Sequence, residues 1–200
     1  MSQLNFSCAA KRSFDILVAV IGGLCVSPLL ILATIAIGLD SRGNPIFSQE
    51  RVGRDRARFT CFKLRTMKRD TADIPTHLVS ANVMTRLGPF LRRSKIDELP
   101  QLWNVLRGDM SLVGPRPCLP SQVELISERS TNGVFKVRPG ITGLAQVQGI
   151  DMSNPQMLAR VDAEYISNWN FLSDLQILIK TVGGGGRGDS VSGRPRERNT

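Results

Sequence analysis

Residues 16–38 read ILVAVIGGLCVSPLLILATIAIG, and these 23 consecutive residues include no charged side chain. As a straight helix rising about 1.5 Å per residue, the stretch would be roughly 34 Å long, enough to cross the hydrocarbon core of a bilayer. It is apolar on every face, unlike the amphipathic helices that usually cover a small core. It is also long for a signal peptide, and no small-residue cleavage site leads from it into a secreted-looking domain. The stretch therefore predicts a membrane segment.

Basic residues flank this apolar run on both sides. Lys11 and Arg12 precede it, and positions 40–70 carry nine basic against four acidic residues. Basic residues favour the cytoplasmic side of a membrane, so both flanks point to one face. Ser27-Pro28 lies near the middle, where a proline bends or breaks a helix and a serine hydroxyl can bond a freed carbonyl. Two alternatives remain open on these residues: a kinked spanning helix, or a re-entrant helix-break-helix.

The composition limits the classes of protein to which the chain can belong. The chain has 200 residues, enough for one compact domain with an appendage. Its net charge of +9 favours anionic partners such as phosphates, a lipid surface or nucleic acid. The single histidine, His77, argues against histidine-rich metal sites, and four cysteines without a CxxC pair argue against a disulfide framework or a structural zinc site.

The chain after the apolar run is typical of a mixed α and β domain. Residues 45–67 alternate in places around Gly53-Arg54-Asp55, which predicts two short strands joined by a basic turn. Residues 84–107 repeat apolar side chains at helical spacing in two pieces, punctuated by Pro100, with basic residues among them. This mixture fits helices at a membrane surface, although ordinary amphipathic core helices show it too.

Shorter helices and loops are expected beyond these segments. Helices are predicted over 121–130, from the N-cap Asn154 onward, and over 172–182. Loops are predicted over 70–83, 108–120 and 137–149, and the glycine- and arginine-rich tail over 183–200 is expected to be disordered.

The stretch with most chemical information is SKIDELPQL, residues 94–102. Asp97 and Glu98 are adjacent carboxylates just before a proline, and nearby cations would keep both ionised. Ionised carboxylates are hard oxygen ligands for Mg²⁺, and a carboxylate can also attack phosphorus. A helix surface of mixed charge is the alternative for such a pair taken alone.

Three basic segments are candidates for binding phosphate. Arg116 lies between two prolines, which presents its planar guanidinium from a stiff loop. Arg138 begins a glycine-rich turn that would let backbone N–H groups approach a phosphate. Lys63 and Arg65 are two residues apart on one predicted strand face. Taken singly, each segment could equally be a solvated basic turn.

These segments together resemble the bacterial sugar transferase family, the small monotopic phosphoglycosyl transferases. The resemblance extends from about residue 11 to about residue 181. It is carried by KRSFD (11–15), the apolar run with Ser-Pro, FKLRTM (62–67), SKIDELPQLWNVLRGDMSLVGPRP (94–117) and RPGITGLAQVQG (138–149).

The resemblance implies an enzyme that transfers a sugar-1-phosphate from a UDP-sugar to polyprenyl (undecaprenyl) phosphate and releases UMP. Such a step begins the membrane assembly of exopolysaccharide, O-antigen, capsule or glycoprotein glycans. Asp97 matches the family's nucleophile, which forms a covalent phosphosugar intermediate. Glu98 matches its acidic partner, and both carboxylates are expected to bind the required Mg²⁺.

The resemblance also assigns supporting residues. Arg116 lies in the family's phosphate-facing loop. Beside it, Lys63, Arg65, Arg92 and Arg138 are candidates for binding phosphate on the ground of their own charge and position in the sequence. Ser27 and Pro28 match the break of a re-entrant membrane helix.

The expected fold is α+β and mainly helical. A re-entrant membrane hairpin over 1–40 precedes a cytoplasmic catalytic domain over 41–182, with interfacial amphipathic helices and a small β-hairpin, and a disordered tail over 183–200. The expected location is the cytoplasmic face of the bacterial inner membrane.

Two other classes of protein compete with this interpretation. A nucleic-acid-binding protein would use the positive charge, but the cations surround carboxylates and only 6% of residues are aromatic, which leaves few stacking platforms. Nucleic acid is therefore not an expected partner. A membrane-anchored scaffold without catalysis predicts that Asp97→Asn changes nothing measurable. The sequence indicates neither the transferred sugar nor the oligomeric state.

Overall fold

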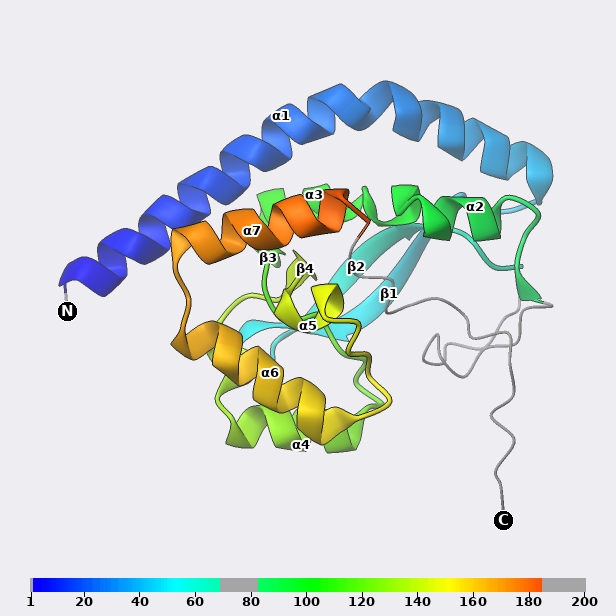
Figure 1. Ribbon diagram of the computed structural model, residues 1–200. Coiled ribbons are helices and arrows are strands. Elements are labelled where there is room, and N and C mark those ends of the chain that lie inside the picture. The colour runs from blue at the N-terminus through cyan, green and yellow to red at the C-terminus, as the bar shows by residue number, and fades with distance from the viewer. Residues whose placement is uncertain (1, 69–82, 185–200) are drawn as a thin grey trace, which may run out of the picture.

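The computed structural model describes residues 2–68 and 83–184. Helix α1 (Ser2–Asp40) arches over a row formed by α7 (Phe171–Val182), α3 (Gln101–Arg107) and α2 (Gly88–Arg93), as Figure 1 shows. Helices α4 (Val123–Thr131) and α6 (Pro155–Ser167) pack together at the end of the molecule away from α1. The loop expected over 70–83 and the tail expected over 183–200 lie outside the described residues, except for residues 83, 183 and 184.

Helix α1 continues through Pro28 without ending, and Figure 1 shows that the helix bends between its two ends, so the expected break is a bend within one helix. Proline has no N–H to donate to the carbonyl of Leu24, four residues earlier. The Ser27 hydroxyl donates to that same carbonyl at 2.8 Å. Because the side chain satisfies the acceptor that Pro28 leaves free, the helix does not have to end.

The N-terminal half of α1 is fixed to α3 and α7. Arg12 donates from its guanidinium to the carbonyls of Val105 (2.8 Å) and Leu106 (3.3 Å), near the C-terminal end of α3. The ammonium group of Lys11 forms an ion pair with the buried carboxylate of Asp174 on α7.

The C-terminal end of α1 is fixed to the same body. Ile37 is fully buried and packs with Leu64 and Leu91. The guanidinium of Arg65 donates to the carbonyls of Ser41 and Arg42 at 2.6 and 3.0 Å, just after the helix ends. Both ends of α1 therefore rest on one globular unit.

The middle of α1 is an exposed apolar surface. Leu24 is 70% exposed, and Ile31 and Leu32 are 60% and 65% exposed. Among the described residues, Ala9–Asp40 is the one helical stretch long and apolar enough to cross a membrane.

The predicted hairpin is confirmed. β1 (Ile46–Val52) pairs antiparallel with β2 (Arg58–Leu64), in a register from Ile46↔Leu64 to Val52↔Arg58. The basic turn between them contains the short 3₁₀ turn η1 (Arg54–Arg56).

The two helical pieces expected over 84–107 are also present, as α2 and α3. A 3₁₀ turn, η4 (Ile96–Glu98), connects them. Lys95 adopts a left-handed conformation (φ 58°) before this turn, which redirects the chain between the two helices.

The segments predicted as loops over 108–120 and 137–149 contain regular structure that the sequence did not indicate. β3 (Ser111–Val113) and β4 (Gly140–Thr142) form a parallel pair, followed by the short helix α5 (Leu144–Val147). Each strand has three residues and a partner far away in sequence, so no local periodicity reveals the pair. A Cβ atom on Gly140 would lie 2.1 Å from the Gly114 nitrogen, so this close approach requires glycine.

The C-terminal helices lie where the sequence predicts them. Helix α4 is accompanied by the 3₁₀ turn η5 (Val134–Lys136). Asn154 caps α6 by accepting from the Met157 N–H at 3.1 Å, and α6 buries Leu158, Val161 and Tyr165. The largest core cluster joins α1, α3, β3, α6 and α7 through Ala19, Val105, Met110, Leu112, Tyr165 and Ile177.

Candidate active site

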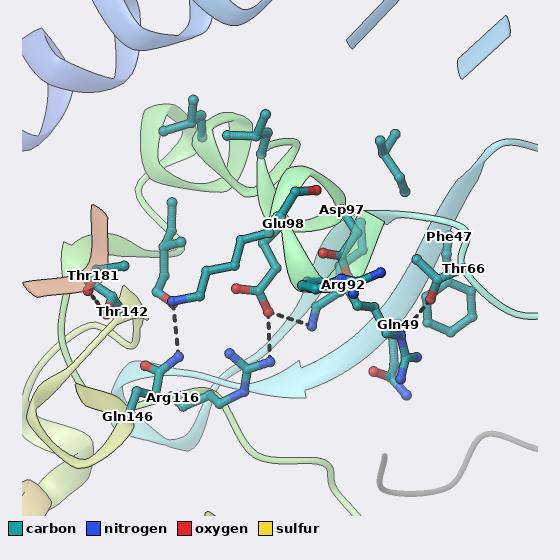
Figure 2. A pocket seen from close by; sticks show the side chains of 18 of the residues that line it. Phe47, Gln49, Thr66, Arg92, Asp97, Glu98, Arg116, Thr142, Gln146 and Thr181 are labelled. Carbon is teal, nitrogen blue, oxygen red and sulfur yellow. Dashed lines mark hydrogen bonds and ion pairs between the residues drawn. The ribbon is translucent and has the colours of Figure 1, made fainter. Parts of the chain in front are cut away.

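The acidic pair lies on η4, between α2 and α3. The Glu98 N–H donates to the Lys95 carbonyl at 3.2 Å, which closes the turn, and Pro100 then begins the next helix. This tight turn allows two consecutive side chains to reach one cavity. Figure 2 shows Asp97 and Glu98 beside Arg92 and Arg116 there.

The cavity has a volume of about 1420 Å³. One wall is apolar and includes Val18, Gly22 and Val26 of α1. The polar wall includes Lys63, Arg92, Asp97, Glu98 and Arg116. Because ligand pockets usually measure roughly 300–1,000 Å³, there is room for more than one substrate group.

Glu98 is held by two cations on one oxygen. Its Oε1 accepts from Arg116 Nη2 at 2.8 Å and from Lys63 Nζ at 3.1 Å. Burial raises the pKa of Glu98, but the charges and hydrogen bonds of Arg116 and Lys63 outweigh that effect and hold its pKa well below the usual range. Glu98 is therefore ionised at neutral pH.

Asp97 has different surroundings although it is the adjacent residue. It is 7% exposed, and within the described part of the chain no donor lies within hydrogen-bond distance of its carboxylate. Burial and the negative charge of Glu98 raise the pKa of Asp97 to about 6, against the opposing charges of Lys63, Arg92 and Arg116. No donor among the described residues thus engages its oxygens.

The structure groups three of the five predicted phosphate-binding cations around this pair. Lys63 and Arg116 contact Glu98 directly. Arg92 lines the cavity and donates from Nε to Thr66 Oγ1 at 2.9 Å. Figure 2 shows Arg92 and Arg116 beside the acidic pair, and Lys63 lines the same cavity, so three positive charges lie around the two carboxyl groups.

The other two predicted cations make backbone contacts at helix ends. Arg65 reaches the cavity wall, but its guanidinium is bonded to the chain that follows α1. Arg138 donates from Nε to the Gly108 carbonyl at 2.8 Å, at the end of α3. Their predicted role in binding phosphate stays a prediction.

Several polar side chains at the cavity were missed by sequence reasoning. Figure 2 labels Gln49, Thr66, Thr142, Gln146 and Thr181 there. Thr142 and Thr181 share a hydrogen bond of 2.7 Å between hydroxyls, and Gln146 Nε2 donates to the Ile141 carbonyl at 3.2 Å. Thr142 and Gln146 belong to the stretch selected for Arg138, whereas Gln49 and Thr181 carry no signal in the sequence.

The donor set fits a magnesium ion that is shared with a substrate. No cluster of three or more His, Cys, Asp or Glu side chains suited to a metal occurs within residues 2–68 and 83–184. Mg²⁺ is commonly bound by one or two carboxylates, with waters and substrate phosphates completing its shell. Asp97 has carboxylate oxygens without protein donors, as such a ligand needs.

Comparison with known sequences gives a consistent result. The sequence profile described as "Bacterial sugar transferase" matches residues 6–186. The chain is 43% identical to "Uncharacterized sugar transferase EpsL" of Bacillus subtilis, across 86% of this chain and 85% of that protein. It is 41% identical to "UDP-glucose:undecaprenyl-phosphate glucose-1-phosphate transferase" of Caulobacter vibrioides, across 86% of this chain and 68% of that protein.

Some relatives are considerably longer than this chain. The chain is 40% identical to "Undecaprenyl-phosphate glucose phosphotransferase" of Komagataeibacter xylinus, across 86% of this chain. It spans only 35% of that protein's length. The similarity to the long relatives thus concerns one part of each.

Proposed function

The chain belongs to the bacterial sugar transferase family, and on that premise we propose that it transfers a sugar-1-phosphate from a UDP-sugar to polyprenyl phosphate and releases UMP. The observation that carries the proposal is the buried carboxylate of Asp97, which has no hydrogen-bond donor among the described residues and lies near three cations in a cavity walled by an apolar helix. The names of the Caulobacter and Komagataeibacter relatives describe this type of reaction.

In the first displacement, an oxygen of ionised Asp97 attacks the phosphorus that bears the sugar. A bond forms between that oxygen and phosphorus, and the bond from phosphorus to the bridging oxygen of the diphosphate breaks. UMP leaves with that electron pair, and Asp97 carries the sugar phosphate as an acyl phosphate. Lys63, Arg92 and Arg116 offset the charge of the approaching diphosphate.

In the second displacement, a phosphate oxygen of polyprenyl phosphate attacks the same phosphorus. The new bond makes the polyprenyl diphosphate sugar, and the breaking bond returns its electron pair to Asp97. The ionised Glu98 stays paired with Arg116 and Lys63, which fixes these two cations beside the reacting phosphorus.

A magnesium ion held by Asp97 and Glu98 would neutralise charge on the diphosphate. The protein's own cations supply part of the same stabilisation, and the low exposure of Asp97 (7%) and of the Glu98 side chain (15%) strengthens each of these interactions.

We also propose that α1 enters the membrane and leaves it on the same face. The bend of the helix, the proline within it and the attachment of both ends to one globular unit support this arrangement. A straight span would place the two ends on opposite sides of the bilayer, about 30 Å apart. The exposed apolar middle of α1 would then be the part buried in lipid.

The row of helices beneath α1 has apolar side chains suited to the membrane interface. On α7, Leu172 and Ile179 are 62% and 64% exposed, and Trp103 of α3 is 58% exposed. Because these helices lie on the α1 side of the molecule (Figure 1), they would place the cavity at the height of lipid headgroups. The apolar cavity wall on α1 then offers a path for the isoprenoid chain.

The test is transfer by the purified protein in lipid nanodiscs. A panel of UDP-sugars is supplied with undecaprenyl phosphate and Mg²⁺, and UMP release is measured together with the lipid product. We expect at least one donor to give both products in equal amounts. Release of UMP from no donor, or equal release without the lipid acceptor, would contradict the proposal.

A further inference from the structure

Arg129 and Asp162 form a buried ion pair apart from the cations that surround the acidic pair. It is connected to one of these cations, Arg116, through that residue's backbone carbonyl. Arg129, in the last turn of α4, is 2% exposed, and Asp162 of α6 is 3% exposed. The Asp162 carboxylate accepts from Arg129 Nε at 3.0 Å and from Nη2 at 2.7 Å. The remaining nitrogen, Nη1, donates to the carbonyl of Arg116 at 2.7 Å.

The loop that carries Arg116 is fixed at four consecutive carbonyls. These accept from three different segments of the chain: Pro115 from Gly140 N (2.9 Å), Arg116 from Arg129 Nη1 (2.7 Å), and Pro117 and Cys118 from the adjacent β1 residues Arg51 (Nη1, 3.0 Å) and Val52 (N, 2.9 Å). The contact from Arg129 is made at the same residue whose side chain holds Glu98.

A charged pair is a costly way to stabilise a core. Removing two charges from water costs several kcal/mol per ion, and apolar replacements of similar size are often as stable. The planar guanidinium can, however, present three nitrogens in a rigid fork, so one side chain binds a carboxylate and a carbonyl at fixed angles. The geometry thus has a directional use beyond stability.

We propose that Arg129 and Asp162 are a positioning pair for the transfer reaction, which fixes the Arg116 backbone so that its guanidinium holds Glu98 and faces the substrate phosphates. The connection runs from Asp162 through Arg129 and Arg116 to Glu98 by hydrogen bonds of 3.0 Å or less. The inference rests on the proposed function. Arg129 does not line the cavity, and Asp162, which does, has its carboxylate held by Arg129.

The first test is a double-mutant cycle. Arg129→Lys keeps the positive charge beside Asp162 but cannot also reach the Arg116 carbonyl. We expect kcat to fall by up to about 100-fold, with a much smaller change in KM for the sugar donor, because the cation next to the reacting phosphorus is misplaced. In an Arg116→Lys background, the same change should cost less than about twofold, since the residue it acts through is already altered.

Tyr165→Phe is the matched control for a merely structural effect. Tyr165 lies on α6 one turn after Asp162, is buried, and donates to Asp174 Oδ1 at 2.6 Å. Tyr165→Phe should lower the unfolding temperature. Its effect on kcat should be small, and equal in the wild-type and the Arg116→Lys background. An equal fold-loss for Arg129→Lys in both backgrounds would overturn the positioning role.

A second variant avoids leaving a lone buried charge. Arg129→Gln combined with Asp162→Asn replaces the pair with neutral amides, so the fold should survive while the bond to the Arg116 carbonyl is lost. We expect kcat to fall as for Arg129→Lys. Unchanged kcat in this folded double variant would contradict the proposal.

A structure of Arg129→Lys tests the proposal without activity. We expect the Arg116 Nη2 to Glu98 Oε1 distance to lengthen from 2.8 Å to beyond hydrogen-bond range. An unchanged distance would overturn the inference even if the wild type proved inactive. A wild type that releases no UMP, with a lengthened distance in the variant, would refute the proposed function alone.

Discussion

Asp97 and Glu98 are adjacent on one 3₁₀ turn, yet the pKa values of their carboxyl groups are shifted in opposite directions. The charges of Arg116 and Lys63 hold the pKa of Glu98 low, whereas burial and the charge of Glu98 raise the pKa of Asp97 to about 6. One carboxylate is thus fixed as a charge, and the other keeps oxygens that can react.

Replacing Asp97 by asparagine should abolish transfer. The amide is nearly the same size but cannot form the bond to phosphorus, so we expect UMP release to fall to background. The matched control is Asp109→Asn, on the turn after α3, which should retain activity. Mass spectrometry of the wild type with donor alone should show a phosphosugar adduct at Asp97, and an active Asp97→Asn enzyme would exclude the covalent route.

The same change should stabilise the folded protein at neutral pH. The pKa of Asp97 is raised from 3.8 to about 6, so between these values the folded state binds more protons than the unfolded state. Stability therefore falls as pH rises through this window and stays lower above it, by up to about 3 kcal/mol. Without Mg²⁺, Asp97→Asn should unfold at a higher temperature than wild type at pH 7, and the difference should shrink towards pH 4.

Activity should decline on the acid side of about pH 6. Protonated Asp97 cannot attack, so kcat/KM should fall roughly tenfold per pH unit below its pKa. Glu98 stays ionised throughout this range because its pKa is lowered. A kcat/KM profile that stays flat from pH 7 to pH 5 would speak against Asp97 as the group that must be ionised.

Arg116 and Arg138 should respond differently to removal. Arg116→Ala should lower kcat and also raise KM for the sugar donor, because its guanidinium lies at Glu98 in the cavity and is removed altogether. Arg138→Ala should instead lower stability by about 1.5–3 kcal/mol, since it loses a charged donor to the Gly108 carbonyl. Donor KM and unfolding free energy are measured for both. An equal rise in the KM for the sugar donor in the two variants would support a role of Arg138 in binding phosphate.

Both ends of α1 should be labelled from the same side of the membrane. Single cysteines replace Ser13 and Asn44, which are exposed, in a chain where Cys8 and Cys25 are alanine. A membrane-impermeant maleimide should label both positions in inside-out vesicles and neither in intact cells.

Pro28→Ala is the companion variant for this experiment. It restores an N–H for the Leu24 carbonyl, which should straighten the helix and shift part of the population to a spanning form. Wild-type labelling at opposite faces would disprove re-entry.

Local sequence patterns determined much of the secondary structure of this protein. Each of these patterns acts within a few residues: the uncharged run, the alternation of the hairpin, the Asn154 cap and the prolines around α3. The main helices and both long strands could therefore be predicted. The acidic pair and Arg116 were identified from motifs and a family resemblance for the same reason.

The tertiary structure decided what depends on distant partners. Ser111 pairs with Gly140, Arg129 reaches the Arg116 carbonyl, and Arg65 and Arg138 bond to backbone instead of joining the acidic pair. It also decided that two adjacent carboxyl groups differ, because burial and neighbouring charge are properties of the folded surroundings. A sequence specifies which groups are present, but only packing sets the distances and the local dielectric that determine their chemistry.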